Sequence, residues 1–175
     1  MLRRLLLALF PVAAVTGCAP PQAAQTPEGA PPTPNYDHLL HLDAEELAEG
    51  GVLEAYRKLL PELRRYVPEP QVVTEDNDDQ TPRYTVRSGT KQHLIQAPEI
   101  PEADTWGRAT YAFFSIVNDQ LESTPVRFYA LNNGNDLGGM FLTPSQATAA
   151  RSNLPNKFDW PYLPTNEPPY FGMYH

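Results

Sequence analysis

DTWGRATYAFFSIVNDQL, residues 104–121, is the stretch of sequence that decides the fold of this chain. Its apolar residues recur at steps of three and four, which is typical of one helix face: Trp106, Ala109, Phe113, Ile116, Val117 and Leu121. Tyr111, Ala112 and Phe114 widen this face beyond the stripe of a surface helix. A strand would divide adjacent apolar pairs, such as Phe113 and Phe114, between its two faces. We therefore predict a buried central helix.

The segment before this helix predicts another helix followed by strands. Residues 43–46 form a capping-box start, and an apolar stripe continues to Val67, with a weak point at Gly50-Gly51. Pro61 is expected to kink or restart this helix. Residues 71–74 and 83–87 are then predicted to form a hairpin around an acidic turn at 75–79, and residues 90–96 to add a third strand.

The segment after the central helix predicts a second hairpin and a short helix. Residues 126–131 and 139–142 have the composition of strands, and Thr143-Pro144 opens a helix to about Asn153. Residues 158–175 hold six aromatic residues and four prolines, which predicts an ordered extended strap whose rings lie across the sheet or helices. The predicted fold class is α+β: a single domain with three main helices, a small, mostly antiparallel sheet and this strap.

The N-terminus has the layout of a secretory signal. Arg3 and Arg4 precede an apolar run from Leu5 to Val15, which is too short to span a bilayer, and Val15-Thr16-Gly17-Cys18 follows. This pattern resembles a bacterial lipoprotein signal peptide over residues 1–18. The resemblance implies that residues 1–17 are removed and that Cys18 is lipidated. It also implies outer-membrane attachment facing the periplasm, because Ala19 replaces the aspartate that marks inner-membrane retention.

Residues 18–35 carry the lipidated cysteine and a tether rich in proline and alanine, which has too little apolar surface to offset the entropy of ordering. We predict a globular domain over residues 36–175. Removing the leader, which contains two arginines and no acidic residue, changes the formal net charge from −8 to −10. Such a surface disfavours nucleic acid and anionic headgroups. Membrane association would therefore come from acyl chains on Cys18.

The most suggestive candidate site is the polar, glycine-rich loop of residues 132–139. Its candidate ligand- or partner-binding residues are Asn132, Asn133, Asn135 and Asp136. Glycines let a backbone approach a ligand, and the Asn and Asp side chains can donate or accept hydrogen bonds. The same composition also suits a plain hairpin turn with positive φ, so both interpretations stand. The loop lacks the pattern of a phosphate-binding loop.

No metal, cofactor or catalytic residue is predicted. The acidic residues 75–79 are read as a solvated turn or a weak divalent site, because an EF-hand loop starting at Asp76 would place Thr81 and Arg87 where glycine and glutamate belong. His38 and His41 have helical spacing without a clear third ligand. None of the serines lies in a nucleophile elbow.

These observations favour a membrane-anchored envelope lipoprotein that acts as a non-enzymatic binding module. In one version it is an immunity-type inhibitor, whose acidic domain captures a basic periplasmic toxin. The alternatives are an envelope hydrolase acting on cell-wall or lipid substrates with the 132–139 loop at its site, and a structural envelope scaffold. A concave pocket lined by the loop and by aromatic residues of the strap would favour a ligand, whereas a convex apolar surface would favour a protein partner.

Overall fold

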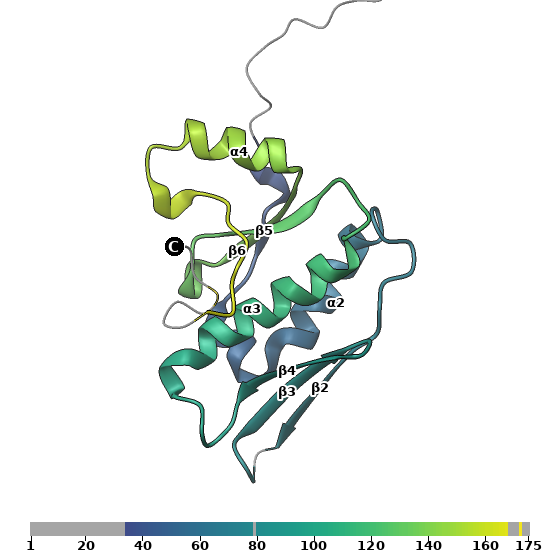
Figure 1. Ribbon diagram of the computed structural model, residues 1–175, viewed down its shortest axis with the longest axis vertical. Helices are drawn as coiled ribbons and strands as arrows, with labels where there is room; N and C mark the ends of the chain where they lie inside the picture. The colour runs from purple at the N-terminus through teal and green to yellow at the C-terminus, as the bar shows by residue number, and fades with distance from the viewer. Residues whose placement is uncertain (1–33, 79, 168–171, 173–175) are drawn as a thin grey trace, which may run out of the picture. The chain divides into compact units, whose positions relative to one another are not determined.

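The computed structural model describes residues 34–78, 80–167 and 172 (Figure 1). The predicted leader, Cys18 and most of the predicted tether lie outside the described residues. The described part is a mixture of helices and small antiparallel sheets, so the α+β class is confirmed.

Helix α3, Glu102–Gln120, is the predicted central helix. It contacts strand β4 (Lys91–Gln96) on one side and strand β5 (Arg127–Leu131) on the other (Figure 1). Its middle and C-terminal turns are buried, and the rings of Phe113 and Phe114 pack edge to face with their centroids 5.7 Å apart. Trp106, which we placed on the buried face, is 40 % exposed because the first turns of α3 extend past the core.

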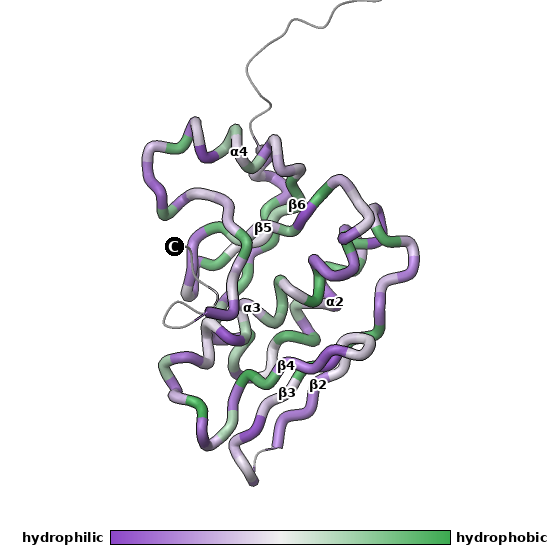
Figure 2. Tube along the Cα trace, viewed as in Figure 1, coloured by the Kyte–Doolittle hydropathy of each residue, from purple (hydrophilic) through white to green (hydrophobic). Residues whose placement is uncertain are grey.

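Strands β2 (Val73–Asp78), β3 (Arg83–Ser88) and β4 form one antiparallel sheet in the order β2-β3-β4. This confirms the third strand and corrects the acidic turn, because residues 75–78 continue β2. The outer strand β2 is hydrophilic in Figure 2. Its carboxylates are accommodated by neighbours: Asp76 lies 3.9 Å from the guanidinium of Arg87, and Glu75 turns toward helix α2.

The first helical region is divided into α1 (Ala44–Glu46), a π-helical turn η2 (Leu47–Gly51) and α2 (Val52–Leu63). Asp43 caps α1, as predicted, by accepting from the amides of Glu45 and Glu46. The break falls at Gly50, whose φ is 102°. The helix does not restart at Pro61: Pro61 lies inside α2, close to the end of that helix at Leu63.

The start of α2 is capped by the sheet. The Glu75 carboxylate accepts from the Leu53 amide at 3.0 Å and from the Tyr84 hydroxyl at 2.8 Å, and that hydroxyl accepts from the Val52 amide at 3.3 Å. The Tyr84 side chain is fully buried, and this burial together with Glu75 raises the pKa of its hydroxyl. Strands β2 and β3 therefore supply the cap that Gly51 cannot.

A second antiparallel sheet has the order β1-β6-β5, with β1 at Leu40–His41 and β6 at Gly138–Leu142. The single small sheet that we predicted is thus two three-stranded sheets within the described part of the chain, with α3 contacting a strand of each. Helix α4 (Pro144–Asn153) follows β6 and begins, as predicted, at a Thr143 cap, which is completed by the side chain of Gln146.

Short 3₁₀ turns complete the description at Tyr36–His38 (η1), Gly134–Asp136 (η3) and Lys157–Asp159 (η4). Tyr162 is buried and exchanges backbone hydrogen bonds with Ala130 of β5 at 2.8 and 2.9 Å. Phe158 departs from the predicted strap, because the residue is 77 % exposed and so does not bury its ring against a sheet or helix. Tyr170, Phe171 and Tyr174, on which the strap also depended, lie outside the described residues.

Candidate functional site

The predicted loop is the connection between β5 and β6, and it contains the 3₁₀ turn η3. Asn132 has a φ of 56° and Gly134 a φ of 60°, so the loop has the positive-φ geometry that the turn interpretation required. The Tyr162 hydroxyl donates to the Asn132 carbonyl at 2.8 Å, and burial raises the pKa of that hydroxyl. The first residue of the loop is therefore fixed by a neutral, buried tyrosine.

One side of this loop forms a pocket with a volume of about 560 Å³, which we call the Phe158 pocket. All four predicted binding residues line it: Asn132, Asn133, Asn135 and Asp136. Phe158 and Tyr162, from the C-terminal segment, line the same pocket although they are distant in the sequence. Its apolar lining also includes Leu39, Leu42 and Leu137. The loop and the aromatic segment thus meet in one concave site.

The polar side chains of the Phe158 pocket are largely uncommitted. Those of Asn132, Asn133 and Asp136 make no hydrogen bond or ion pair with any described residue. Asn135 donates from Nδ2 to the Glu45 carboxylate of α1 at 3.2 Å, which leaves its Oδ1 available. The pocket therefore offers amide donors and acceptors to a ligand at no cost in internal hydrogen bonds.

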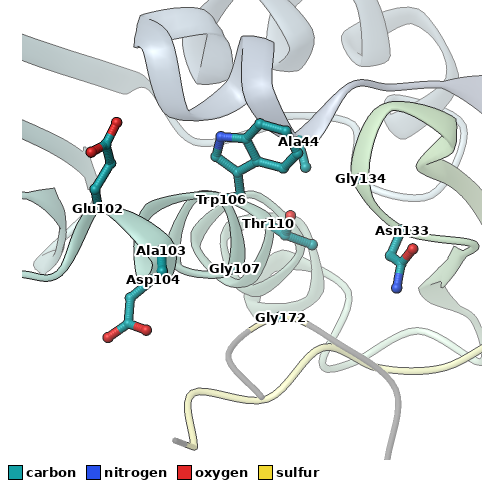
Figure 3. A pocket seen from close by; sticks show the side chains of 10 residues that line it. All are labelled: Ala44, Glu102, Ala103, Asp104, Trp106, Gly107, Thr110, Asn133, Gly134 and Gly172. Atoms are coloured by element: carbon teal, nitrogen blue, oxygen red, sulfur yellow. The ribbon is translucent and has the colours of Figure 1, made fainter. Parts of the chain in front are cut away.

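A second pocket, of about 640 Å³, lies where the same loop approaches the first turns of α3; we call it the Trp106 pocket (Figure 3). Trp106 and Thr110 project from α3, and Asn133 and Gly134 line the pocket from the loop. Figure 3 shows the carboxylates of Glu102 and Asp104 at the other end of the pocket from Asn133. The pocket thus combines an exposed indole ring with a polar margin.

The loop connects the two pockets. Asn133 lines both of them, and Gly134 has open space where a side chain would begin, because a Cβ added there would have no heavy atom within 4 Å. One exposed aromatic ring accompanies each pocket, Trp106 on one side and Phe158 on the other. The main chemical feature of the site is therefore a row of loop side-chain amides with an exposed aromatic residue on each side, Phe158 and Trp106.

The Phe158 pocket has limited means for catalysis. Among the described residues that line it, Asp136 is the one carboxylate and His41 the one imidazole, and no serine, threonine or cysteine contributes. Retaining and inverting glycoside hydrolysis usually require a pair of carboxyl groups. In the described part of the chain no three His, Cys, Asp or Glu side chains gather in a way that would hold a metal ion.

Sequence reasoning placed the four loop residues together and named aromatic residues of the strap as their possible neighbours, as Phe158 and Tyr162 are, but it missed Trp106. Trp106 was assigned to the core because its spacing matches the apolar face of α3, and only the position of the helix end shows that it emerges. Phe158 was grouped with the strap, although it follows the Asn156 cap of η4, whose side chain accepts from the Phe158 amide at 3.2 Å. His38 and His41, whose spacing we considered for metal binding, do not line one site: His41 lines the Phe158 pocket, and His38 lines another hollow beside Tyr66.

Comparison of the chain with protein-family models, curated proteins and solved structures finds no match. Among the described residues, no helix combines the length and the apolar character needed to cross a bilayer.

Proposed function

We propose that this protein is a lipid-anchored lipoprotein of the bacterial envelope whose domain binds a small ligand without transforming it. The anchoring part is supported by the residues alone: the basic start, the short apolar run and Val15-Thr16-Gly17-Cys18. Acyl chains on Cys18 would hold the domain at the membrane, and the proline-rich residues 19–35 would act as a tether to the periplasmic side of the outer membrane.

The observation that carries the binding part is the Phe158 pocket. Residues 132–136 and 158–162, which are distant in the sequence, line one concavity of a size typical of ligand sites. A concave site with free amides favours a ligand over a broad protein partner. The charge of −10 expected after leader removal remains the support for an immunity-type partner, and it specifies no surface.

Anchoring is tested by intact-mass measurement of protein extracted from membranes, together with fractionation of a Cys18→Ser variant. The proposal expects residues 1–17 to be absent, an acyl mass on Cys18, and release of the variant from the membrane fraction. A parent protein that retains its leader and carries no acyl mass would contradict it.

Binding is tested by thermal unfolding of the domain in an envelope extract that contains sugars, peptides and lipid headgroups. We expect the unfolding midpoint to rise, because a ligand that binds the folded state stabilises it. The rise should disappear in a Phe158→Ala variant and persist in Val72→Ala, a matched control at an 80 % exposed apolar residue outside both pockets. No rise in the parent, or an equal rise in both variants, would contradict binding at this pocket.

A further inference from the structure

We propose that the ligand is a carbohydrate chain that lies across the 132–136 loop, with one sugar unit in the Phe158 pocket and a later unit in the Trp106 pocket. This inference depends on the proposed binding function and names the chemical class of its ligand. Phe158 is 77 % exposed and lines a pocket with several polar side chains. A sugar ring has an apolar face that covers such a ring and hydroxyl groups around its edge that need hydrogen bonds.

The polar groups of the Phe158 pocket match that edge. Asn132 and Asn133 each carry a donor and an acceptor on one side chain, and both groups lack partners among the described residues. Sugar hydroxyls and acetamido groups likewise donate and accept. Anionic ligands are disfavoured because Asp136 lines this pocket and no lysine or arginine does so among the described residues. A neutral, hydroxyl-rich ligand satisfies these groups best.

The second unit is inferred from what lies beyond the loop. Asn133 faces both pockets, and at Gly134 the loop presents bare backbone to open space, so a chain can pass from one pocket to the other without meeting a side chain there. Trp106 then offers a second ring, 40 % exposed. Thr110, which also lines the Trp106 pocket, supplies a hydroxyl near it. A single small molecule would explain the first pocket but leave the second ring without a role.

The test uses the soluble Cys18→Ser chain without its leader and measures affinity for β-linked N-acetylglucosamine as the mono-, di- and tetrasaccharide. Affinity should rise about tenfold or more from the monosaccharide to the tetrasaccharide as the second ring engages. Phe158→Ala should weaken every member of the series about tenfold, whereas Phe158→Tyr, which keeps a ring, should retain binding. Trp106→Ala should abolish the gain with length and leave the monosaccharide unaffected. Val72→Ala should change nothing.

Several outcomes separate this inference from the proposed function. If the envelope extract stabilises the domain through Phe158 and none of these sugars binds, the sugar class is wrong and the binding function stands. Equal affinity along the series, or a length dependence that survives Trp106→Ala, would overturn the two-pocket path. Tighter binding of a basic peptide than of the tetrasaccharide at the same residues would replace the sugar with a peptide ligand. Circular dichroism of each variant confirms that it is folded.

Discussion

Two groups of side-chain amides in this protein have opposite roles. Asn118 of α3 is fully used inside the fold: its Nδ2 donates to the carbonyls of Phe114 and Phe128 at 2.9 Å, and its Oδ1 accepts from the Phe128 amide at 2.8 Å. The side chains of Asn132 and Asn133 have no such partners among the residues that the structure describes, and they line a pocket. The same chemical group is thus structural at one place and available at the other.

Gln120 reinforces the comparison. Its Oε1 accepts from the Gln71 amide at 2.7 Å and from the Tyr56 hydroxyl at 3.2 Å, and its Nε2 donates to the Ile116 carbonyl. These bonds join α2, α3 and the chain leading into β2. A buried polar group without a partner is costly, so the fold satisfies its interior amides and leaves unsatisfied ones where water or a ligand can reach them.

The largest expected effect on this comparison comes from Asn118→Ala. The change removes the side-chain partner of the Phe128 amide and of the Phe128 carbonyl at the junction of α3 and β5, so the free energy of unfolding should fall by about 3 kcal/mol. Urea denaturation measures it. A loss as small as that of the loop variants would show that this junction does not depend on the amide.

The next largest difference is expected between a glycine of the sheet, Gly139 in β6, and a glycine of the loop, Gly134, in how much an alanine substitution lowers the free energy of unfolding. A Cβ at Gly139 would overlap the ring of Phe128, so Gly139→Ala should cost about 2 kcal/mol through overpacking. Gly134→Ala meets no neighbouring atom and has only its positive φ to oppose it, which costs about 1 kcal/mol. The same urea titrations compare them. Reversal of this order would mean that the loop, and not the sheet, is the tighter region.

A smaller effect should come from pH through His93 of β4. Its Nε2 is buried without a hydrogen-bond partner in the described structure. Desolvation lowers the pKa of His93; Asp119 opposes this effect, and Lys91 adds to it. The ring of Tyr111 in α3 packs against the imidazole of His93, with the two ring centroids 5.9 Å apart.

Because the unfolded chain takes up this proton at a higher pH than the folded chain, stability contributed by neutral His93 is present above about pH 6.5 and is lost as the pH falls through the lowered folded value. Denaturation at pH 7 and at pH 5.5 should show the loss, and His93→Gln should reduce it. An unchanged pH dependence in that variant would assign the effect to other groups.

The smallest effect on stability is expected at the loop. Asn133→Ala removes no hydrogen bond within the described structure, so the free energy of unfolding should change by less than about 0.5 kcal/mol. The same variant should bind ligand more weakly, as measured by calorimetric titration with the tetrasaccharide. A clear loss of stability would mean that Asn133 has a structural role after all.

The sequence was informative wherever one local rule dominated. The recurrence of apolar residues at steps of three and four, together with adjacent apolar pairs, predicted α3. The Thr143-Pro144 start predicted α4 and its cap. The sequence did not predict features that depend on contacts between distant residues. Glu75 was assigned to an acidic turn, whereas in the structure it accepts hydrogen bonds from Tyr84 and from the start of α2. Similarly, the residue types of 132–136 pointed to a site, but the aromatic rings that complete it depend on where α3 ends and where η4 lies. The division of the strands into two sheets was not predicted either, because the composition of a strand does not specify which strand pairs with it.

The most direct test of the account is an NMR titration of the labelled domain with the tetrasaccharide, observed at the side-chain amides. We predict that the NH₂ signals of Asn132, Asn133 and Asn135 shift in a saturable way, while those of Asn118 and Gln120 stay in place. Shifts at Asn118 and Gln120 with none at the loop would contradict the division between structural and available amides, and no shift anywhere in a folded domain would contradict the carbohydrate ligand.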